Sequence, residues 1–388
     1  MDASSLYQKK LVSKEQYRAL CVGQWGSSYF PDKRSQEESL RELLMLAETA
    51  GVKTLHELFF HHSDINAALF FSSGQIEKIR KVCEELNLNL LFVDAQLKPN
   101  QLRNLEEELR IRVLGRIEVI LDIFAMRART REAILQVELA QLLYILPRLK
   151  GLGGVLSRQG ATGAPGIGTR GPGETMLETD RRYIRRRIQK IRRELDDVER
   201  HRGTARQGRN LVTYALVGYT NAGKSSVLNA LSSSSQKVFA EDKLFATLDT
   251  FSRKIYLGEK DYKPEYAIIT DTVGFIRNLP ASLVAAFQST LDEIRHADVI
   301  IEVHDASSAQ LGDEMEVVQA ELKRLESGDK PRLLYFNKDD LVFADTRREL
   351  SEKYPQAIWG NALSKEGIAP LRTALSQRQK ADALAVNS

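Results

Sequence analysis

Hydrophobic positions in the first third of the chain follow two alternating patterns. Short apolar runs, typical of buried strands, are separated by stretches whose apolar residues recur every three or four positions, as in amphipathic helices. The apolar runs are 19–23, 52–60, 88–93 and 111–114, and the helical stretches are 39–50, 73–86 and 98–109. Strands that alternate with helices in this way form a parallel sheet. We therefore expect residues 1–116 to form a small parallel α/β domain.

A ligand site in this first domain has little support from the sequence. Asp94 ends an apolar run, at the edge of the sheet where ligands bind in many α/β folds. A helix cap is an equally good interpretation of Asp94. Gly74 is explained by a turn that starts the helix over 73–86, and no glycine fingerprint is present.

The next segment, 117–210, has two long helical patterns, over 117–149 and 176–203. Consecutive amphipathic helices of this length usually fold back on one another, each burying its apolar stripe against the other. Residues 151–173, between the two, contain nine glycines. We therefore expect a long antiparallel helical hairpin with a glycine-rich tip.

Arginine is concentrated on this hairpin, and no acidic residue interrupts the stretch from Arg181 to Arg193. A flexible linker beside a solvated, charged pair of helices is one interpretation. We favour an RNA-binding finger, because arginine suits phosphate and a glycine-rich tip allows close backbone approach. The candidate RNA-binding residues are Arg158, Arg170, Arg181, Arg182, Arg185 and Arg186.

A third pattern begins with the apolar run 212–217, which predicts a buried strand. It is followed by Gly218–Ser225, which matches G-x-x-x-x-G-K-[ST], and by 226–231, which reads as the first turns of a helix. In such a strand–loop–helix arrangement the backbone N–H groups and the helix N-terminus cradle phosphates, and the lysine reaches the β and γ phosphates. The pattern predicts a P-loop nucleotide site.

Two later strand ends add to this nucleotide site, and the second of them predicts that the base is guanine. Run 266–271 ends in Asp271 and continues to Gly274; the aspartate can hold Mg²⁺ and the glycine N–H can sense a γ-phosphate. Run 332–336 leads into Asn337-Lys338-Asp339-Asp340, the pattern N-K-x-D. The Asp340 carboxylate can accept hydrogen bonds from guanine N1–H and N2–H₂, a pair of donors that adenine lacks. A buried carboxylate left without such a partner costs about 1–3 kcal/mol.

The remaining elements complete a Ras-like P-loop GTPase domain over 211–376, followed by a loose tail, 377–388. Residues 245–250 are expected to form the first switch segment. Thr247 is the candidate Mg²⁺ ligand, and Thr250 is the alternative. The candidate catalytic residues are Lys224, Thr247 and Gly274. The candidate Mg²⁺ ligands are Ser225, Thr247 and Asp271. The candidate GTP- and GDP-binding residues are Gly218, Tyr219, Thr220, Asn221, Ala222, Gly223, Lys224, Ser225, Ser226, Asp271, Gly274, Asn337, Lys338, Asp340, Asn361 and Ala362.

Composition adds little to this picture. The net charge of +4 is nearly neutral, so nucleic-acid binding has to come from local clusters. The two cysteines, Cys21 and Cys83, lie in apolar surroundings without metal-ligand spacing, which predicts buried thiols. No apolar run approaches the about 20 residues of a membrane span, and no signal peptide is evident. We expect a cytoplasmic protein.

Several motifs together resemble those of HflX GTPases. These are Gly166–Thr175 (GIGTRGPGET), Leu177–Arg182 (LETDRR), Asp271–Arg277 (DTVGFIR), Leu121–Ala125 (LDIFA) and Gln136–Leu142 (QVELAQL). The resemblance covers nearly the whole chain. It implies a GTPase that binds the large ribosomal subunit with its hairpin tip near the peptidyl-transferase centre. It also places Phe275 where Ras-like proteins carry the glutamine that orients water, which implies slow hydrolysis without the ribosome.

Two functions fit this resemblance. The first is dissociation of stalled or idle 70S ribosomes, with GTP hydrolysis controlling release. The second is assembly or chaperoning of the large subunit, through rRNA binding and without splitting. Membrane signalling through the basic helix is a weaker third, because pairing of the hairpin leaves no apolar face. We expect a monomer in each case.

Overall fold

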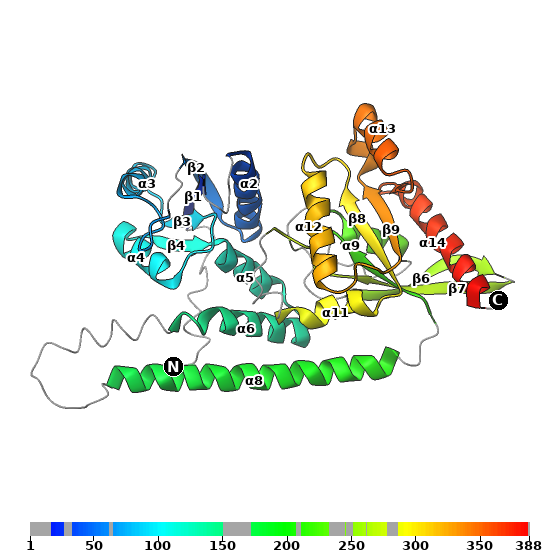
Figure 1. The fold of residues 1–388 in the computed structure, drawn as a ribbon, viewed down its shortest axis with the longest axis horizontal. Coiled ribbons are helices and arrows are strands. Elements are labelled where there is room, and N and C mark those ends of the chain that lie inside the picture. The colour runs from blue at the N-terminus through cyan, green and yellow to red at the C-terminus, as the bar shows by residue number, and fades with distance from the viewer. Residues whose placement is uncertain are drawn as a thin grey trace, which may run out of the picture. The chain divides into compact units, whose positions relative to one another are not determined.

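The structure is a computed structural model that describes residues 17–26, 33–61, 65–149, 172–206, 211–232, 245, 251–260, 262–277 and 286–386. Contacts divide the chain into two compact units. The first comprises 1–126, 134–196 and 280–286, and the second comprises 127–133, 197–279 and 287–388. Each unit has a sheet of its own (Figure 1).

The first unit is built on a four-stranded, all-parallel sheet with the order β2-β1-β3-β4. Its elements are β1 (Arg18–Trp25), α2 (Lys33–Thr49), β2 (Lys53–His61), α3 (Ser73–Glu85), β3 (Leu90–Val93), α4 (Pro99–Leu109), β4 (Arg112–Gly115), α5 (Arg116–Arg127) and α6 (Arg131–Ile145), with α8 (Pro172–Arg206) starting in this unit. The parallel α/β domain expected from the apolar runs is therefore confirmed. Helix α2 begins six residues before the predicted stretch 39–50.

Successive side chains of each strand point to opposite faces of this sheet, so helices pack on both faces. Leu20 and Val22 of β1 pack with α3 and α4 on one side, and helix α2 contacts β1 and β2. Cys21 and Cys83 are free and buried, as expected, and burial raises the pKa of Cys21 to about 12 and that of Cys83 to about 11. Both thiols are therefore protonated and unreactive at neutral pH.

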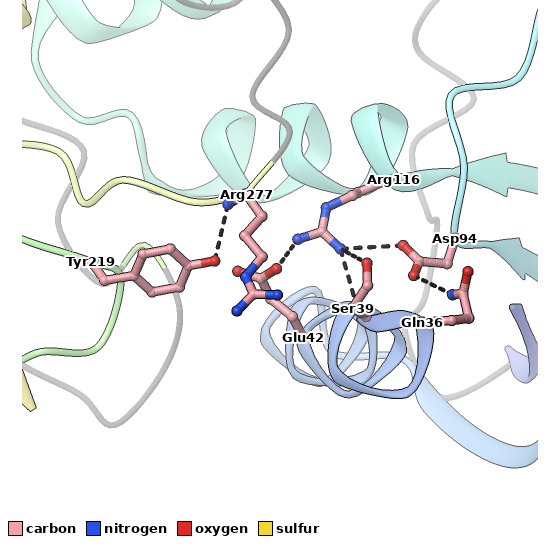
Figure 2. Close-up of polar contacts among 7 residues, drawn as sticks. All are labelled: Gln36, Ser39, Glu42, Asp94, Arg116, Tyr219 and Arg277. Carbon is pink, nitrogen blue, oxygen red and sulfur yellow. Dashed lines mark hydrogen bonds and ion pairs between the residues drawn. The ribbon is translucent and has the colours of Figure 1, made fainter. Parts of the chain in front are cut away.

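A buried polar cluster joins three elements of the first unit (Figure 2). Arg116, the first residue of α5, donates from Nη1 to Asp94 Oδ1 at 3.2 Å and from Nη2 to Glu42. Gln36 Nε2 donates to the other oxygen of Asp94 at 2.8 Å, and Arg116 also donates to the backbone and hydroxyl oxygens of Ser39 at 3.3 Å. Arg116 is 5% exposed and Asp94 2%. The cluster accounts for Asp94 without a ligand, and Asp94 caps no helix, because α4 begins after Lys98.

The predicted hairpin is present with one correction. The stretch 117–149 is not a single helix: α5 ends at Arg127 and α6 begins at Arg131, after a break in which the Thr130 hydroxyl accepts the Ala133 N–H at 3.2 Å. A threonine in this position caps the new helix. Helices α6 and α8 run antiparallel (Figure 1), and Arg187 of α8 forms two hydrogen bonds of 2.6 Å with Glu138 of α6. The tip, 151–171, lies outside the described residues.

Helix α8 buries the predicted stripe. Ile184, Ile188, Ile191 and Leu195 are each less than one tenth exposed, and they recur at intervals of three and four residues. Burying an aliphatic side chain of this size contributes about 1.5–3 kcal/mol. The stripe therefore fixes which side of α8 faces the protein, and it leaves the charged side outward.

The second unit is a six-stranded sheet with the order β10-β9-β8-β5-β7-β6, in which only the β6–β7 pair is antiparallel. Its elements are β5 (Thr213–Val217), α9 (Lys224–Leu231), β6 (Phe251–Lys260), β7 (Lys263–Asp271), α11 (Gln288–His296), β8 (Val299–Asp305), α12 (Leu311–Arg324), β9 (Arg332–Asn337), the short 3₁₀ helix η2 (Asp339–Leu341), α13 (Ala344–Lys353), β10 (Ile358–Trp359) and α14 (Lys365–Val386). The chain leaves the parallel strands β5, β7, β8 and β9 at one edge of this sheet, where α/β folds bind ligands.

Helices cover both faces of this sheet, as in doubly wound folds. Helices α9 and α14 pack on the side of Leu216, Ile301 and Tyr335, and residues of α12 and α13 pack on the side of Phe336. The expected loose tail over 377–388 is wrong, because α14 continues to Val386. The segment after Pro370 contains no glycine or proline that would end the helix. Within the described residues, no helix is long and apolar enough to cross a membrane.

Candidate functional site

The loop between β5 and α9 has the geometry expected of a phosphate cradle. Residues 218–223 form a turn, and α9 begins at Lys224. Gly223 has a φ of +94°, and a side chain there would clash with Asn337, while a side chain at Gly218 would clash with the backbone carbonyl of Val303. Both glycines are therefore required for the backbone to pass this close to its neighbours. All nine candidate residues from 218 to 226 lie in this loop or in the first turn of α9.

Lys224 lies under the loop and reaches back across it. Its Nζ donates to the carbonyl oxygens of Gly218 at 3.1 Å and Tyr219 at 2.8 Å. The side chain is buried, and this burial lowers the pKa of Lys224 to about 8, although the nearby Asp271 carboxylate acts in the opposite direction. The Thr220 hydroxyl oxygen is also buried, without a hydrogen-bond partner among the described residues. An ammonium group and a spare hydroxyl at the same loop suit a phosphate ligand.

Two candidate Mg²⁺ ligands meet beneath the loop. Asp271 ends β7 and is fully buried, and Ser225 Oγ donates to its Oδ2 at 2.6 Å. A hydroxyl and a carboxylate are oxygen donors of the kind that Mg²⁺ prefers, and Mg²⁺ usually takes its other ligands from water and phosphate. Among the described residues, no group of three or more His, Cys, Asp or Glu side chains is placed to hold a metal. Thr247 and the alternative ligand, Thr250, lie outside the described residues.

Asn337 joins the motifs that surround the expected base. Its Nδ2 donates to the carbonyl of Ala222 at 2.9 Å, and its Oδ1 accepts the N–H of Ala362 at 3.0 Å. One buried side chain therefore connects the P-loop with the two loops that follow β9 and β10. The Asn361 Oδ1 accepts the N–H of Leu363 at 2.8 Å, which shapes the last of these loops.

Lys338 and Asp340 follow β9 at the same edge of the sheet. Lys338 has left-handed backbone geometry, with a φ of 61°, and its Nζ lies 2.7 Å from Asp305 Oδ2. Asp340 is exposed in η2, and its carboxylate is accessible to a base. The sequence interpretation missed Asp305. Asp305 ends β8, and only the pairing of β8 with β9 shows that its carboxylate lies near Lys338.

The Gly274 segment lies directly against the P-loop. The N–H of Phe275 donates to the Gly218 carbonyl at 3.1 Å, and the Phe275 carbonyl accepts the Thr220 N–H at 2.8 Å. The Phe275 side chain is 2% exposed. Gly274 lies beside Lys224 of the P-loop.

The candidate RNA-binding arginines are only partly described. Arg182, Arg185 and Arg186 are exposed on α8, and Arg181 is half-buried. Arg187 is engaged by Glu138, and this hydrogen bond raises its pKa, so its charge is already compensated within the protein. Arg192 and Arg193 extend the exposed arginine face by about two further turns. Arg158 and Arg170 lie outside the described residues.

Three family models match consecutive parts of the chain. A GTP-binding GTPase N-terminal model matches 37–125, a GTP-binding GTPase middle-region model matches 127–209, and a 50S ribosome-binding GTPase model matches 213–338. Together these models follow the order that the motifs predict.

Curated relatives match most of the chain. GTPase HflX of Caldanaerobacter subterraneus subsp. tengcongensis is 47% identical over 309 residues, which is 79% of this chain and 70% of the relative. GTPase HflX of Escherichia coli K12 is 39% identical over 355 residues, which is 90% of this chain and 81% of the relative. The resemblance drawn from the motifs is therefore confirmed.

Two solved structures are also similar. One is a complex of SsGBP with GDP, at 24% identity and a TM-score of 0.49, covering 95% of this chain and 99% of that one. The other is a GTP-binding protein of Sulfolobus solfataricus with GDP, at 22% identity and a TM-score of 0.46, covering 94% and 99%. The assignment rests on the sequence relatives alone. The chain belongs to the HflX family of GTPases, which hydrolyse GTP.

Proposed function

We propose that this GTPase binds the large ribosomal subunit and dissociates stalled or idle 70S ribosomes, with GTP hydrolysis controlling its release. The observation that carries the proposal is the exposed arginine face of α8, which includes Arg182, Arg185 and Arg186 and lies opposite the buried stripe. A surface of this kind attracts RNA phosphates without reading base sequence. The matching family model, whose description names 50S ribosome binding, supports the same partner.

The nucleotide site supplies the switch in this proposal. Backbone N–H groups of 218–226 and the Lys224 ammonium hold the phosphates, and Asp340 selects guanine. Ser225, Asp271 and Thr247 hold Mg²⁺, which when bound neutralises charge on the phosphates. Water is the nucleophile. Phe275, which has no group able to orient that water and is almost fully buried, makes hydrolysis slow until the ribosome stimulates it.

In this proposal the chain has three domains. Residues 1–116 form the N-terminal domain, 117–210 the hairpin with its tip at 151–173, and 211–376 the GTPase domain. The tip, with Arg158 and Arg170, reaches towards rRNA near the peptidyl-transferase centre. The protein acts as a monomer in the cytoplasm.

Sedimentation of purified 70S ribosomes with the protein and GTP tests the proposal. We expect the 70S peak to fall and the two subunit peaks to rise. If 70S particles stay intact while free large subunits bind the protein tightly, splitting is refuted and a role in subunit assembly takes its place. A non-hydrolysable GTP analogue separates binding from release, because it should leave the protein bound to large subunits.

Charge reversal on α8 tests the proposed RNA contact. Arg182, Arg185 and Arg186, replaced together with Glu, should lose most ribosome binding while GDP affinity stays the same. The matched control reverses Lys323, Arg324 and Arg348, which are exposed in the second unit and give the same change in net charge. Equal losses in both variants would mean that total charge, rather than this face, determines binding.

A further inference from the structure

The side chain of Tyr219 connects the P-loop to the segment that follows β7. Its hydroxyl accepts the backbone N–H of Arg277 at 3.0 Å (Figure 2). The ring is 7% exposed, so this hydrogen bond is shielded from water. Backbone atoms of the same loop form a bridge of parallel type with Phe275. Three hydrogen bonds, two from backbone and one from the Tyr219 hydroxyl, therefore hold residues 275–277 against the P-loop.

A second anchor holds the far end of the same segment. The Arg277 guanidinium donates to Asp313 of α12 at 2.9 Å. Asp313 is more than half exposed, so this ion pair is weakened by solvent and salt. The buried tyrosine contact is therefore stronger than this ion pair.

The segment held in this way includes the residue expected to sense a γ-phosphate. A methyl group placed on Gly274 would come within 2.9 Å of Lys224 Nζ and within 2.9 Å of Thr220 Cα. Gly274 thus lies in direct contact with the phosphate loop and its lysine. A γ-phosphate that binds between the Lys224 ammonium and the Gly274 N–H requires this segment to move away from the loop.

We infer that Tyr219 is a positioning residue that favours the GDP-bound arrangement over the GTP-bound one. Its hydroxyl stabilises the contact between the Gly274–Arg277 segment and the P-loop, and that contact opposes γ-phosphate binding. A ligand changes such an equilibrium only by its differential affinity for the two arrangements. Loss of the hydroxyl therefore raises the affinity for GTP relative to GDP. The inference rests on the proposed roles of Lys224 and Gly274 at the phosphates.

Replacement of Tyr219 with Phe removes the hydroxyl and keeps the ring. In the full-length protein with GDP, the Arg277 amide should exchange its hydrogen faster, because it loses its acceptor. The ratio of the dissociation constants, GDP over a non-hydrolysable GTP analogue, should rise about 2–10-fold, the range that corresponds to one net neutral hydrogen bond. Tyr262→Phe is the matched control, because the Tyr262 side chain is fully exposed, and neither quantity should change in it.

The outcomes separate this inference from its premises. An equal loss of affinity for both nucleotides, or unchanged exchange at Arg277, would overturn the inference and leave Tyr219 a purely structural residue. Loss of all nucleotide affinity in Lys224→Ala, together with an unchanged ratio in Tyr219→Phe, would overturn the inference alone and keep the site. Undiminished nucleotide affinity in Lys224→Ala would overturn the site and the inference with it.

Discussion

The buried cluster around Arg116 gives a strong test of how the first unit is stabilised. Replacement of Arg116 with Met keeps most of the side-chain volume and removes the guanidinium. Asp94 and Glu42, both less than one tenth exposed, then lose their ion pairs with this guanidinium. Removing one partner of a buried ion pair costs about 3–5 kcal/mol, because it leaves an uncompensated charge. We expect a loss in that range.

The two tryptophans allow this loss to be assigned to one unit. Trp25 lies in β1 of the first unit and Trp359 in β10 of the second. In a Trp359→Phe background, urea unfolding followed by fluorescence reports the first unit. With a denaturant slope of about 1–3 kcal/mol/M, the Arg116→Met midpoint should fall by more than about 1 M. In the complementary Trp25→Phe background, the Trp359 transition should move much less.

A second variant distinguishes charge from packing. In Arg116→Met combined with Asp94→Asn and Glu42→Gln, no uncompensated charge remains, so much of the stability should return. If Arg116→Met lowers the free energy of unfolding by less than about 1 kcal/mol, the buried cluster does not stabilise the first unit. If the triple variant is no more stable than the single one, the loss comes from packing rather than from charge.

Three further predictions concern the nucleotide site. Burial lowers the pKa of Lys224 from 10.5 to about 8, so between these pH values the unfolded chain binds one proton more than the folded, nucleotide-free protein. The stability of the nucleotide-free protein should therefore rise as the pH rises through this window. Calorimetry should show that GDP affinity falls above pH 8, by up to about tenfold per pH unit, because the Lys224 ammonium loses its proton. A flat affinity profile would mean that the Lys224 ammonium does not bind phosphate. Gly218→Ala should lower stability by about 1–3 kcal/mol in thermal unfolding, because the methyl group meets the Val303 carbonyl, whereas Gly312→Ala, with open space in α12, should be neutral or stabilising. Asp340→Asn should weaken GDP and favour XDP in a displacement assay, because an amide can donate to the xanthine oxygen; retained guanine preference would place the base elsewhere.

The elements that carry local sequence signals were predicted well. The run 212–217 and the glycine loop after it fix β5, the turn and α9, because a buried strand and two obligatory glycines leave few alternatives. The parallel sheet of the first unit was also predicted from local patterns, namely apolar runs that alternate with helical stretches. In each of these cases the physical cause lies within a few residues of its effect.

The features that were missed depend on residues far apart in the sequence. Arg116 meets Glu42 and Asp94 across 74 and 22 positions, and no periodicity marks such a pairing. The Lys338–Asp305 contact and the Tyr219–Arg277 hydrogen bond are of the same kind. They arise from the order of strands in a sheet, which the pattern of apolar residues does not give.

The helix boundaries show a different limit. The break between α5 and α6 comes from one capping threonine, Thr130, inside an apolar pattern that continues on both sides. The C-terminal segment, predicted to be a loose tail, carries helix-forming residues and continues α14 to Val386. A local cap therefore interrupts the apolar pattern over 117–149, and local helix propensity extends the last helix.

In the proposed function, the ribosome controls GTP hydrolysis at this site. The most direct measurement is steady-state GTP turnover by the full-length protein alone, with purified large subunits, and with small subunits as the control. We predict slow turnover alone, a large increase with large subunits, and little change with small subunits. Turnover that is fast without ribosomes, or that large subunits leave unchanged, would show that the ribosome does not control this site.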